Sequence, residues 1–348
     1  TITWTSANMD AETIKYEAYV RQGLTTTWDW LELVPALPNT GSFNFTIPAD
    51  AKYGTQYKIR LTGNTSGTSD ESDNAFQITA TPSIYDIQIE NDGSPNWASQ
   101  WENDSVRIGG IVTAVASGSK NYYLQAGTGE WSGIYVYYNT THTYQPGDSL
   151  IVIGKVLEFN KLTELSTTKA ATVVSSGNTL PAAAQITTAA ANTENYEGVL
   201  VKVTGATCSA GSNGNYTVND GSGDLVVYNS IYSGLTMEVG RKYDITGVLG
   251  WYNTTSQYQL YPRNADDIYL YSNDATLSDL KVDGVTVTGF DPATLTYDVE
   301  LPYGTTTVPT VTYTLNDAKA TAIKTDAAAL PGSTTVAVTA EDGLVSQT

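Results

Sequence analysis

The middle of this 348-residue chain contains an internal sequence repeat of two copies, and this duplication limits the available folds more than any other feature. The two copies lie within residues 106–268 and repeat four strand-like blocks in the same order. Gly127 and Gly221, at the ends of corresponding blocks, are 94 residues apart. Gly154 and Gly247, inside corresponding strands, are 93 residues apart. An offset this constant indicates a duplicated structural unit rather than chance alternation.

Each copy has the pattern of a small closed β-barrel. The run 150–157 is apolar on both faces, as a strand that is covered on both sides would be. Gly154 and Gly247 interrupt otherwise strong strands, and glycine there fits either a bulge or a sharp coil that closes a barrel. We therefore predict two tandem barrels, over residues 82–180 and 181–272.

The flanking segments alternate apolar and polar residues. In the first 81 residues, Ile14 and Tyr16 alternate with Lys15 and Glu17. Residues 273–348 repeat the pattern at 295–301 and 311–315. A period of two predicts sheets with one buried and one solvated face. The fold class is therefore all-β, with a β-sandwich at residues 1–81 and another at 273–348.

The first barrel copy carries a series of short motifs. These are Gly110-Ile-Val-Thr-Ala, Tyr123-Leu-Gln, Gly133-Ile-Tyr-Val-Tyr, Gly147-Asp and Leu162-Thr-Glu-Leu. The series resembles the OB-fold (oligonucleotide/oligosaccharide-binding) region before the catalytic domain of secreted nucleases in the endonuclease/exonuclease/phosphatase superfamily. This resemblance covers about half of the chain and implies two OB-like barrels. The family often has Asp after the Gln, where this chain has Ala126 but keeps Asp220 in the second copy.

Two further resemblances concern the ends of the chain. Ile2-Thr-Trp-Thr-Ser and Gly41-Ser-Phe-Asn-Phe-Thr-Ile-Pro resemble the Ser/Thr-rich, immunoglobulin-like domain of fungal cell-wall glucan-assembly proteins, a module widespread in bacterial secreted proteins. Ala275-Thr-Leu-Ser-Asp-Leu and Gly289-Phe-Asp-Pro-Ala-Thr-Leu-Thr-Tyr resemble the cadherin-like β-sandwich of bacterial surface proteins. These resemblances imply one more strand before the first motif and one after the Glu341-Asp-Gly turn. Either the chain was cut at both places, or strand exchange with another subunit completes the modules by self-association.

The composition limits the partners and the compartment. With 17 Lys and Arg against 36 Asp and Glu, the formal net charge is −19, which disfavours nucleic acid as a ligand. The charge suits a well-solvated extracellular protein, and we expect a secreted or cell-surface location. The single cysteine, Cys208, excludes an intramolecular disulfide. No run of 18 apolar residues is present, so no membrane span is expected.

No residues with the pattern of a catalytic site are found. A nucleophilic triad would need the sole histidine, His142, which lies in a polar stretch and is expected to be a solvated surface residue. Cys208 has no basic neighbour in sequence, and a small residue at a strand end is the simpler interpretation. No acidic residue lies in an apolar setting that would predict a raised pKa. We therefore expect no enzyme activity.

Calcium is the one cofactor with candidate ligands. Asn219, Asp220 and Asp224 place oxygen donors at intervals in Asn-Asp-Gly-Ser-Gly-Asp, without the downstream Glu of an EF-hand loop. An Asp-Gly hairpin turn explains the same residues, and that interpretation is favoured. We therefore expect no cofactor, with calcium kept as the alternative.

Aromatic side chains are the best ligand-binding candidates. They share positions on two neighbouring strands or the adjoining loop of each copy: Trp131, Tyr135, Tyr137 and Tyr138 in the first, and Tyr228, Trp251 and Tyr252 in the second. OB barrels bind single strands or sugars across such faces. Because sugar stacking needs no positive charge, a polysaccharide suits this acidic chain better than nucleic acid. Packing of these rings between adjacent domains is the equal alternative.

Three functions remain open on these grounds. The leading hypothesis is a non-catalytic extracellular surface or filament-forming protein, structural or adhesive, built of rigid β modules. The first alternative is the substrate-binding accessory region of a secreted nuclease whose catalytic domain lies outside this chain. The second is a carbohydrate-binding accessory protein.

Overall fold

The computed structural model describes residues 2–5, 13–20, 29–44, 54–74, 76–78, 81–89 and 98–348. These residues form strands, one short α-helix and three turns of 3-10 helix, which confirms the all-β class. The chain divides into two compact units. The first comprises Thr1–Ala184, Thr193–Leu200 and Val248–Gln257, and the second comprises Gln185–Asn192, Val201–Gly247 and Tyr258–Thr348. Within the described ranges, no helix is long and apolar enough to cross a membrane.

The described residues of the first module form two sheets. One pairs β1 (Ile2–Thr3) with β4 (Ser42–Phe43). The other has the order β3-β2-β5-β6, with β7 paired to β5; the bounds are β2 (Thr13–Val20), β3 (Asp29–Pro38), β5 (Gly54–Gly63), β6 (Ser69–Glu71) and β7 (Phe76–Ile78). The rings of Trp4 and Phe43 pack on the buried ring of Tyr16, with centroids 5.6 and 5.1 Å away. The predicted alternation around Tyr16 therefore forms a strand with a buried inner face. The assignment to an immunoglobulin-like family stays a prediction.

The first barrel is closed. Its strands are β8 (Ser105–Val115), β9 (Tyr122–Gln125), β10 (Gly133–Tyr137), β11 (Ser149–Phe159) and β12 (Leu162–Ser166), with β13 (Thr172–Ser175) added at the edge of β11. The order β12-β10-β9-β8-β11 closes because β11 also pairs with β12. The β10–β12 pair is parallel and the other pairs are antiparallel.

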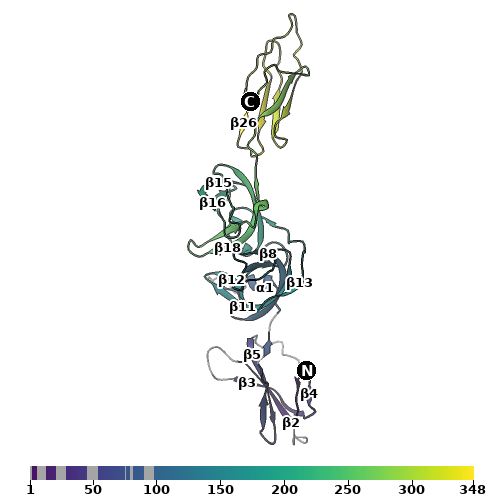
Figure 1. Ribbon diagram of the computed structural model, residues 1–348, viewed down its shortest axis with the longest axis vertical. Coiled ribbons are helices and arrows are strands. Elements are labelled where there is room, and N and C mark those ends of the chain that lie inside the picture. Colours follow the sequence, from purple (N-terminus) through teal and green to yellow (C-terminus); the bar gives the residue numbers. More distant parts are fainter. Residues whose placement is uncertain are drawn as a thin grey trace. The chain divides into compact units, whose positions relative to one another are not determined.

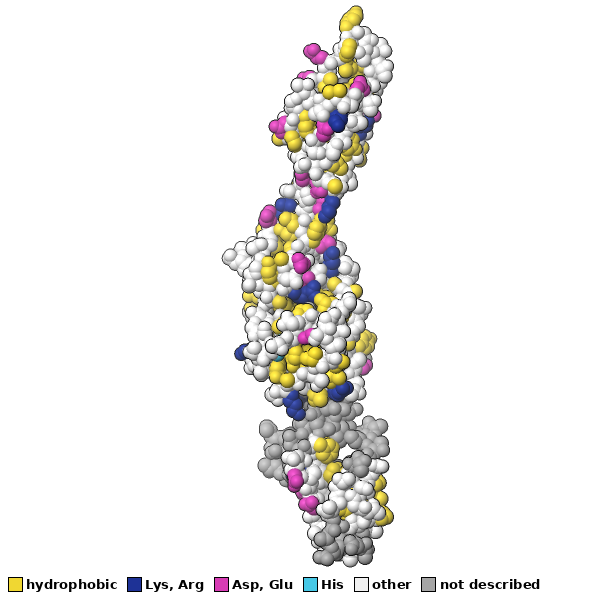
Figure 2. Space-filling view, turned by 45° about the vertical axis from the view of Figure 1, so that its right-hand side comes forward, with side chains coloured by type: hydrophobic (Ala, Val, Ile, Leu, Met, Phe, Trp, Pro, Cys, Tyr) yellow, Lys and Arg dark blue, Asp and Glu magenta, His cyan; other side chains and the backbone are white. Residues whose placement is uncertain are grey.

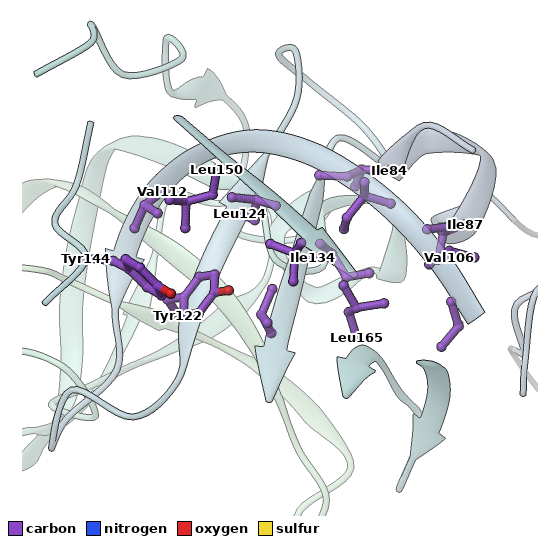
Figure 3. Close-up of a cluster of buried hydrophobic side chains, with 14 residues drawn as sticks. Ile84, Ile87, Val106, Val112, Tyr122, Leu124, Ile134, Tyr144, Leu150 and Leu165 are labelled. Atoms are coloured by element: carbon purple, nitrogen blue, oxygen red, sulfur yellow. The ribbon is translucent and has the colours of Figure 1, made fainter. Parts of the chain in front are cut away.

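Alternate strand residues fill the interior of this barrel, as Figure 3 shows. Leu124, Ile134 and Leu165 are fully buried in one apolar cluster. Helix α1 (Ile84–Gln88), seen beside the barrel strands in Figure 1, adds Ile84 and Ile87 to the same cluster. Each fully buried side chain of this kind contributes about 1.5–3 kcal/mol of transfer free energy.

The second barrel repeats this arrangement. Its strands are β15 (Leu200–Ser212), β16 (Asn215–Asn219), β17 (Asp224–Tyr228), β18 (Lys242–Tyr252) and β19 (Gln257–Tyr261), flanked by β14 (Ala184–Gln185) and β20 (Ile268–Leu270). The order β15-β16-β17-β19-β18 closes through an additional β15–β18 pairing, and the β17–β19 pair is parallel. The same order and the corresponding parallel pair confirm that the middle of the chain holds two similar OB-like barrels. The short helices η1 (Ala190–Asn192), η2 (Glu194–Tyr196) and η3 (Ala265–Asp267) lie in the connections.

Gly154 and Gly247 lie where the backbones of two paired strands come too close together to leave room for a side chain. The bulge interpretation of Gly154 is wrong, because its register with β8 continues without a shift. The bulges lie instead between Val112 and Ala114 and, equivalently, between Cys208 and Ala210. A Cβ at Gly154 would lie 2.7 Å from the Ser166 carbonyl oxygen. At the corresponding place, a Cβ on Gly247 would lie 2.5 Å from the carbonyl oxygen of Tyr261. Any side chain would therefore hold these strand pairs apart.

The last module has two three-stranded sheets. Their orders are β22-β21-β23 and β24-β25-β26, with bounds β21 (Leu277–Val282), β22 (Val285–Thr286), β23 (Val311–Leu315), β24 (Thr321–Thr325), β25 (Thr335–Thr339) and β26 (Ser346–Gln347). The strand predicted at 311–315 is confirmed as β23. The strand predicted at 295–301 is wrong, because no described strand pairs with it and Leu295 is 56% exposed. A groove of about 640 Å³ opens between this segment and both sheets. The cadherin-like assignment stays a prediction.

We expect Gly154→Ala to destabilise the first barrel by about 1–3 kcal/mol, the usual cost of forcing extra volume into a packed site. The matched control is Gly109→Ala on β8, where an added Cβ would meet the Leu150 carbonyl oxygen at an ordinary 3.6 Å. Urea unfolding of both variants measures the difference. Equal stabilities would show that the close approach at Gly154 does not constrain closure.

Candidate ligand-binding face

Strand register places a set of side chains together on the outside of the first barrel. Because Leu124, Ile134 and Leu165 point into the core, their sequence neighbours point outward. Tyr135 on β10 is directly opposite Tyr123 on β9 and Glu164 on β12. The rings of Tyr123 and Tyr135 contact each other with centroids 5.1 Å apart. A buried tyrosine thus holds Tyr135 next to a carboxyl group.

The next row outward along the strands is open to solvent. Tyr137 on β10 is opposite Ser166 on β12, and Ser166 is opposite Lys155 on β11. Tyr137 is 39% exposed, and Lys155 is exposed as well. Tyr135 and Tyr137, two of the predicted binding residues, therefore lie two positions apart on one face.

The opposite end of this face is covered by the segment Thr193–Leu200. The backbone N–H of Leu200 donates to the buried side-chain Oε1 of Gln125 at 2.9 Å. Gly133 and Gly198 meet so closely that a Cβ on either would clash with the other's backbone. The carboxyl of Glu197 accepts a 2.9 Å bond from the Thr163 N–H. This end of the face is therefore covered, whereas Tyr137 at the other end is exposed.

Glu164 has an unusual environment that the sequence analysis missed. The side chain is 5% exposed, and burial together with the nearby Glu158 carboxylate raises its pKa to about 7. None of the residues that the structure describes donates a hydrogen bond to its carboxyl. The expectation that no acid has a raised pKa was wrong. The sequence offered little signal, because Glu164 lies in the mixed strand Leu162–Ser166 and only the tertiary structure shows that this strand pairs along both edges.

Tyr138 does not belong to this face. It packs against the core cluster, 6.3 Å from the ring of His142. His142 stacks on Tyr144 at 4.6 Å and meets Tyr122 edge-on at 5.2 Å. Burial lowers the pKa of His142. The expected solvated surface histidine is therefore wrong, because the sole imidazole is part of an aromatic cluster at the end of the barrel.

The two tryptophan candidates contact other parts of the first unit. Trp131 adopts a left-handed backbone, with φ of 62°, and its N–H donates to the Asn195 carbonyl at 2.7 Å. The ammonium of Lys161 lies over the ring of Trp251, 5.8 Å from its centroid. The Lys161 contact thus involves the ring of Trp251, whereas the hydrogen bond of Trp131 involves its backbone alone. Tyr252, beside Trp251, is exposed.

The second barrel presents a reduced version of the face. Tyr228, at the position equivalent to Tyr137, is 37% exposed and meets the ring of Tyr261 at 6.4 Å. The positions equivalent to Tyr135 and Glu164 hold Val226 and Gln259, which are paired in the same parallel register. Each barrel therefore has one exposed tyrosine ring at this position, but the two residues beside that ring differ between the barrels.

The calcium candidates form a hydrogen-bonded turn. The Asp220 carboxylate accepts bonds from the N–H and hydroxyl of Thr188 and from those of Ser222, at 2.5–3.0 Å. Burial opposes ionisation, but these bonds outweigh it and hold the pKa of Asp220 at about 2. Asn219 donates its side-chain amide to Asp224 at 2.7 Å. The carboxylate that calcium would need is thus already supplied with protein donors.

Cys208 lies at the bulge of β15 and is fully buried, and burial raises the pKa of its thiol. A thiol in this state is a poor nucleophile. In the part of the chain that the structure describes, no group of three or more His, Cys, Asp or Glu is placed to hold a metal ion.

Comparison with known proteins gives two partial matches to bacterial proteins. Over 72 residues, 20% of this chain, the sequence is 56% identical to a gellan lyase from a Bacillus species, covering 3% of that protein. Over 249 residues, 63% of this chain, it is 26% identical to the endonuclease YhcR of Bacillus subtilis, covering 20% of that protein. The chain thus spans a fifth or less of either relative. These matches and the two barrels fit a multi-domain bacterial protein.

No protein-family model matches the chain. Among solved structures, a murine DNA-binding protein bound to double-stranded DNA aligns with a TM-score of 0.28 and 14% identity, covering 48% of this chain and 94% of that one. Tetrameric p202 HIN2 aligns with a TM-score of 0.25 and 13% identity, covering 53% and 95%. Likeness at these scores is too low to support an argument.

We expect Glu164→Gln to stabilise the protein above neutral pH. A carboxyl whose pKa rises from 4.5 when unfolded to about 7 when folded favours the folded state at low pH and loses this contribution as pH rises through 7. The variant should be more stable at pH 8 by up to about 3 kcal/mol and nearly equal at pH 4. Urea unfolding at both values measures this, with exposed Glu102→Gln as the control. A pH-independent difference would contradict the raised pKa.

We expect Asp220→Ala to destabilise the second barrel by about 1–2 kcal/mol at pH 7, because Thr188 and Ser222 lose their acceptor. The lowered pKa means that the wild-type advantage is present above pH 4 and is lost as pH falls through 2. Asp224→Ala, in the same turn but exposed, is the control. Unfolding in calcium and in chelator separates the alternatives: a loss seen only in calcium would assign Asp220 as a calcium ligand.

Proposed function

We propose that this chain is a non-catalytic accessory region of an extracellular bacterial protein, and that it binds a polysaccharide through the aromatic outer faces of its barrels. The observation that carries the proposal is the exposure of Tyr137 and Tyr228. They occupy equivalent positions on β10 and β17, and each is more than a third exposed. Exposed rings on this face of an OB-like barrel suit ligand stacking.

The relatives support an accessory role. One is named as a lyase for gellan, a polysaccharide, and the other as an endonuclease. The chain matches only a small part of each, as expected of a region that accompanies different catalytic domains. The location outside the cell rests on the resemblance to modules of secreted proteins.

Charge favours a polysaccharide over nucleic acid. The cations of the second barrel are engaged with protein groups: Lys202 with Asp244, Arg263 with Asp267, and Arg241 with Glu238. On the face seen in Figure 2, lysine and arginine are interspersed with acidic side chains and form no continuous band. A phosphate backbone normally needs a continuous basic track.

The absence of catalysis is likewise part of the proposal. His142 stacks on Tyr144 and meets Tyr122 edge-on, and Cys208 is enclosed at a bulge. Glu164 has a raised pKa, and the acid beside it is Glu158, whose Oε1 accepts bonds from the Ser99 N–H and the Thr163 hydroxyl. We assign this pair to ligand binding rather than to hydrolysis.

A structural role is the second candidate, and the groove in the last module favours it. Its lining includes apolar residues of both sheets, among them Leu280 and Val336, and the strand-like segment 295–301 has no ladder partner among the described residues. A strand from a second copy would fill the groove and pair with the segment 295–301, and it would join subunits into a filament. Light scattering across a concentration series tests this, since a strictly monomeric protein would rule it out.

We expect the double variant Tyr137→Ala/Tyr228→Ala to weaken polysaccharide binding by about thirtyfold, since each of the two rings contributes about 1 kcal/mol of stacking. Affinity electrophoresis in gels containing gellan or neutral hydroxyethylcellulose gives the dissociation constants. Tyr85→Ala removes an equally exposed tyrosine from α1 and is the control. If the wild-type chain is retarded by neither polymer but binds single-stranded DNA with a steep salt dependence, the proposed ligand is wrong.

A further inference from the structure

The two barrels provide an internal comparison of the same site. Strand register makes Tyr135 and Glu164 of the first barrel equivalent to Val226 and Gln259 of the second. Both pairs lie on the outer face, next to the exposed tyrosine of their barrel. The duplication therefore allows the surroundings of a carboxyl group, Glu164, to be compared with those of an amide, Gln259, at the same place in the fold.

In the second barrel the polar side chain has a protein partner. The Gln259 Oε1 accepts a bond from the Tyr261 hydroxyl at 3.3 Å, and both residues are buried. Tyr261 occupies the position equivalent to Ser166 of the first barrel. The tyrosine that stands in place of serine thus gives the Gln259 side chain a hydrogen-bond donor within the second barrel.

In the first barrel the equivalent acceptor is left open. Glu164 is 95% buried, since only 5% of it is exposed, and within the described ranges it receives no hydrogen bond. Its carboxyl oxygens are not among the described buried atoms that lack a partner, so they reach solvent and a ligand can contact them. A carboxyl group can accept up to about four bonds, and Ser166 is too short to replace the tyrosine donor.

We propose that Glu164 is the hydrogen-bond acceptor of a carbohydrate subsite on the first barrel, in which a sugar ring stacks on Tyr135 and Tyr137 and its hydroxyl groups donate to the carboxyl. The inference rests on the proposed function and names the residues that recognise the ligand. A sugar supplies both an apolar ring face and several hydroxyl donors. The second barrel lacks the stacking ring at Val226 and the open acceptor at Gln259.

The surrounding groups agree with a hydroxyl ligand. The ionisable groups nearest Glu164 are Tyr135, Tyr123, Glu158 and, one row outward, Lys155. Two acids against one exposed lysine repel a phosphate. The segment that ends at Leu200 covers the other end of the face, so the ligand enters past Tyr137.

The test is Glu164→Gln, measured by affinity electrophoresis against gellan and hydroxyethylcellulose at pH 7.5. We expect the dissociation constant for the retarding polymer to rise about tenfold or more, the usual effect of losing a hydrogen bond to a charged group. Glu102→Gln removes the same charge from an exposed position of the same module and should bind like the wild type. Loss of folding is not a concern, because the amide removes a burial penalty, and thermal unfolding at the same pH verifies it.

The outcomes separate this inference from the proposed function. If the wild type binds a polysaccharide and Glu164→Gln binds equally well, the subsite is wrong and the proposed function stands. If both glutamine variants weaken binding alike, net charge is responsible and the subsite is also wrong. If the wild type binds neither polymer, the proposed function fails and the subsite fails with it.

Discussion

The pairing of β11 along both of its edges is the constraint on which the first barrel depends. Its first half bonds to β8 and its second half to β12, and Gly154 lies where the pairing changes. Closure at this point sets the inward or outward direction of every other side chain, because strand residues alternate. The enclosed Leu124 and Ile134 and the outward Tyr135 and Glu164 are consequences of one register.

Buried polar bonds then define one border of the outer face. Gln125 and Glu197 are almost fully enclosed, and each accepts a backbone N–H that would otherwise be left without a partner. A buried acceptor without a donor costs about 1–3 kcal/mol, so these bonds hold the segment Thr193–Leu200 firmly on the barrel. The face that remains is bounded on one side and open on the side of Tyr137.

Glu164 shows how a binding surface can oppose stability. Its burial raises the pKa to about 7, so the ionised form is maintained at the expense of folding free energy. The second barrel has Gln259 and a tyrosine donor at the same place, an arrangement without a buried carboxyl. An uncharged alternative within the same chain makes a functional reason for the acid the simplest explanation.

The sequence by itself determined the β class, the duplication and the aromatic candidates on β10, because period-two patterns, constant offsets and residue types are local properties. It also located Gly154, but the reason is contact with Ser166, a strand neighbour that only the closed barrel supplies. The tertiary structure alone decided that Tyr138 and His142 turn to the core while Glu164 is enclosed beside Tyr135. It also gave 295–301 no ladder partner among the residues that the structure describes. Burial and pairing depend on residues far apart in the chain, and no local pattern records which of them meet.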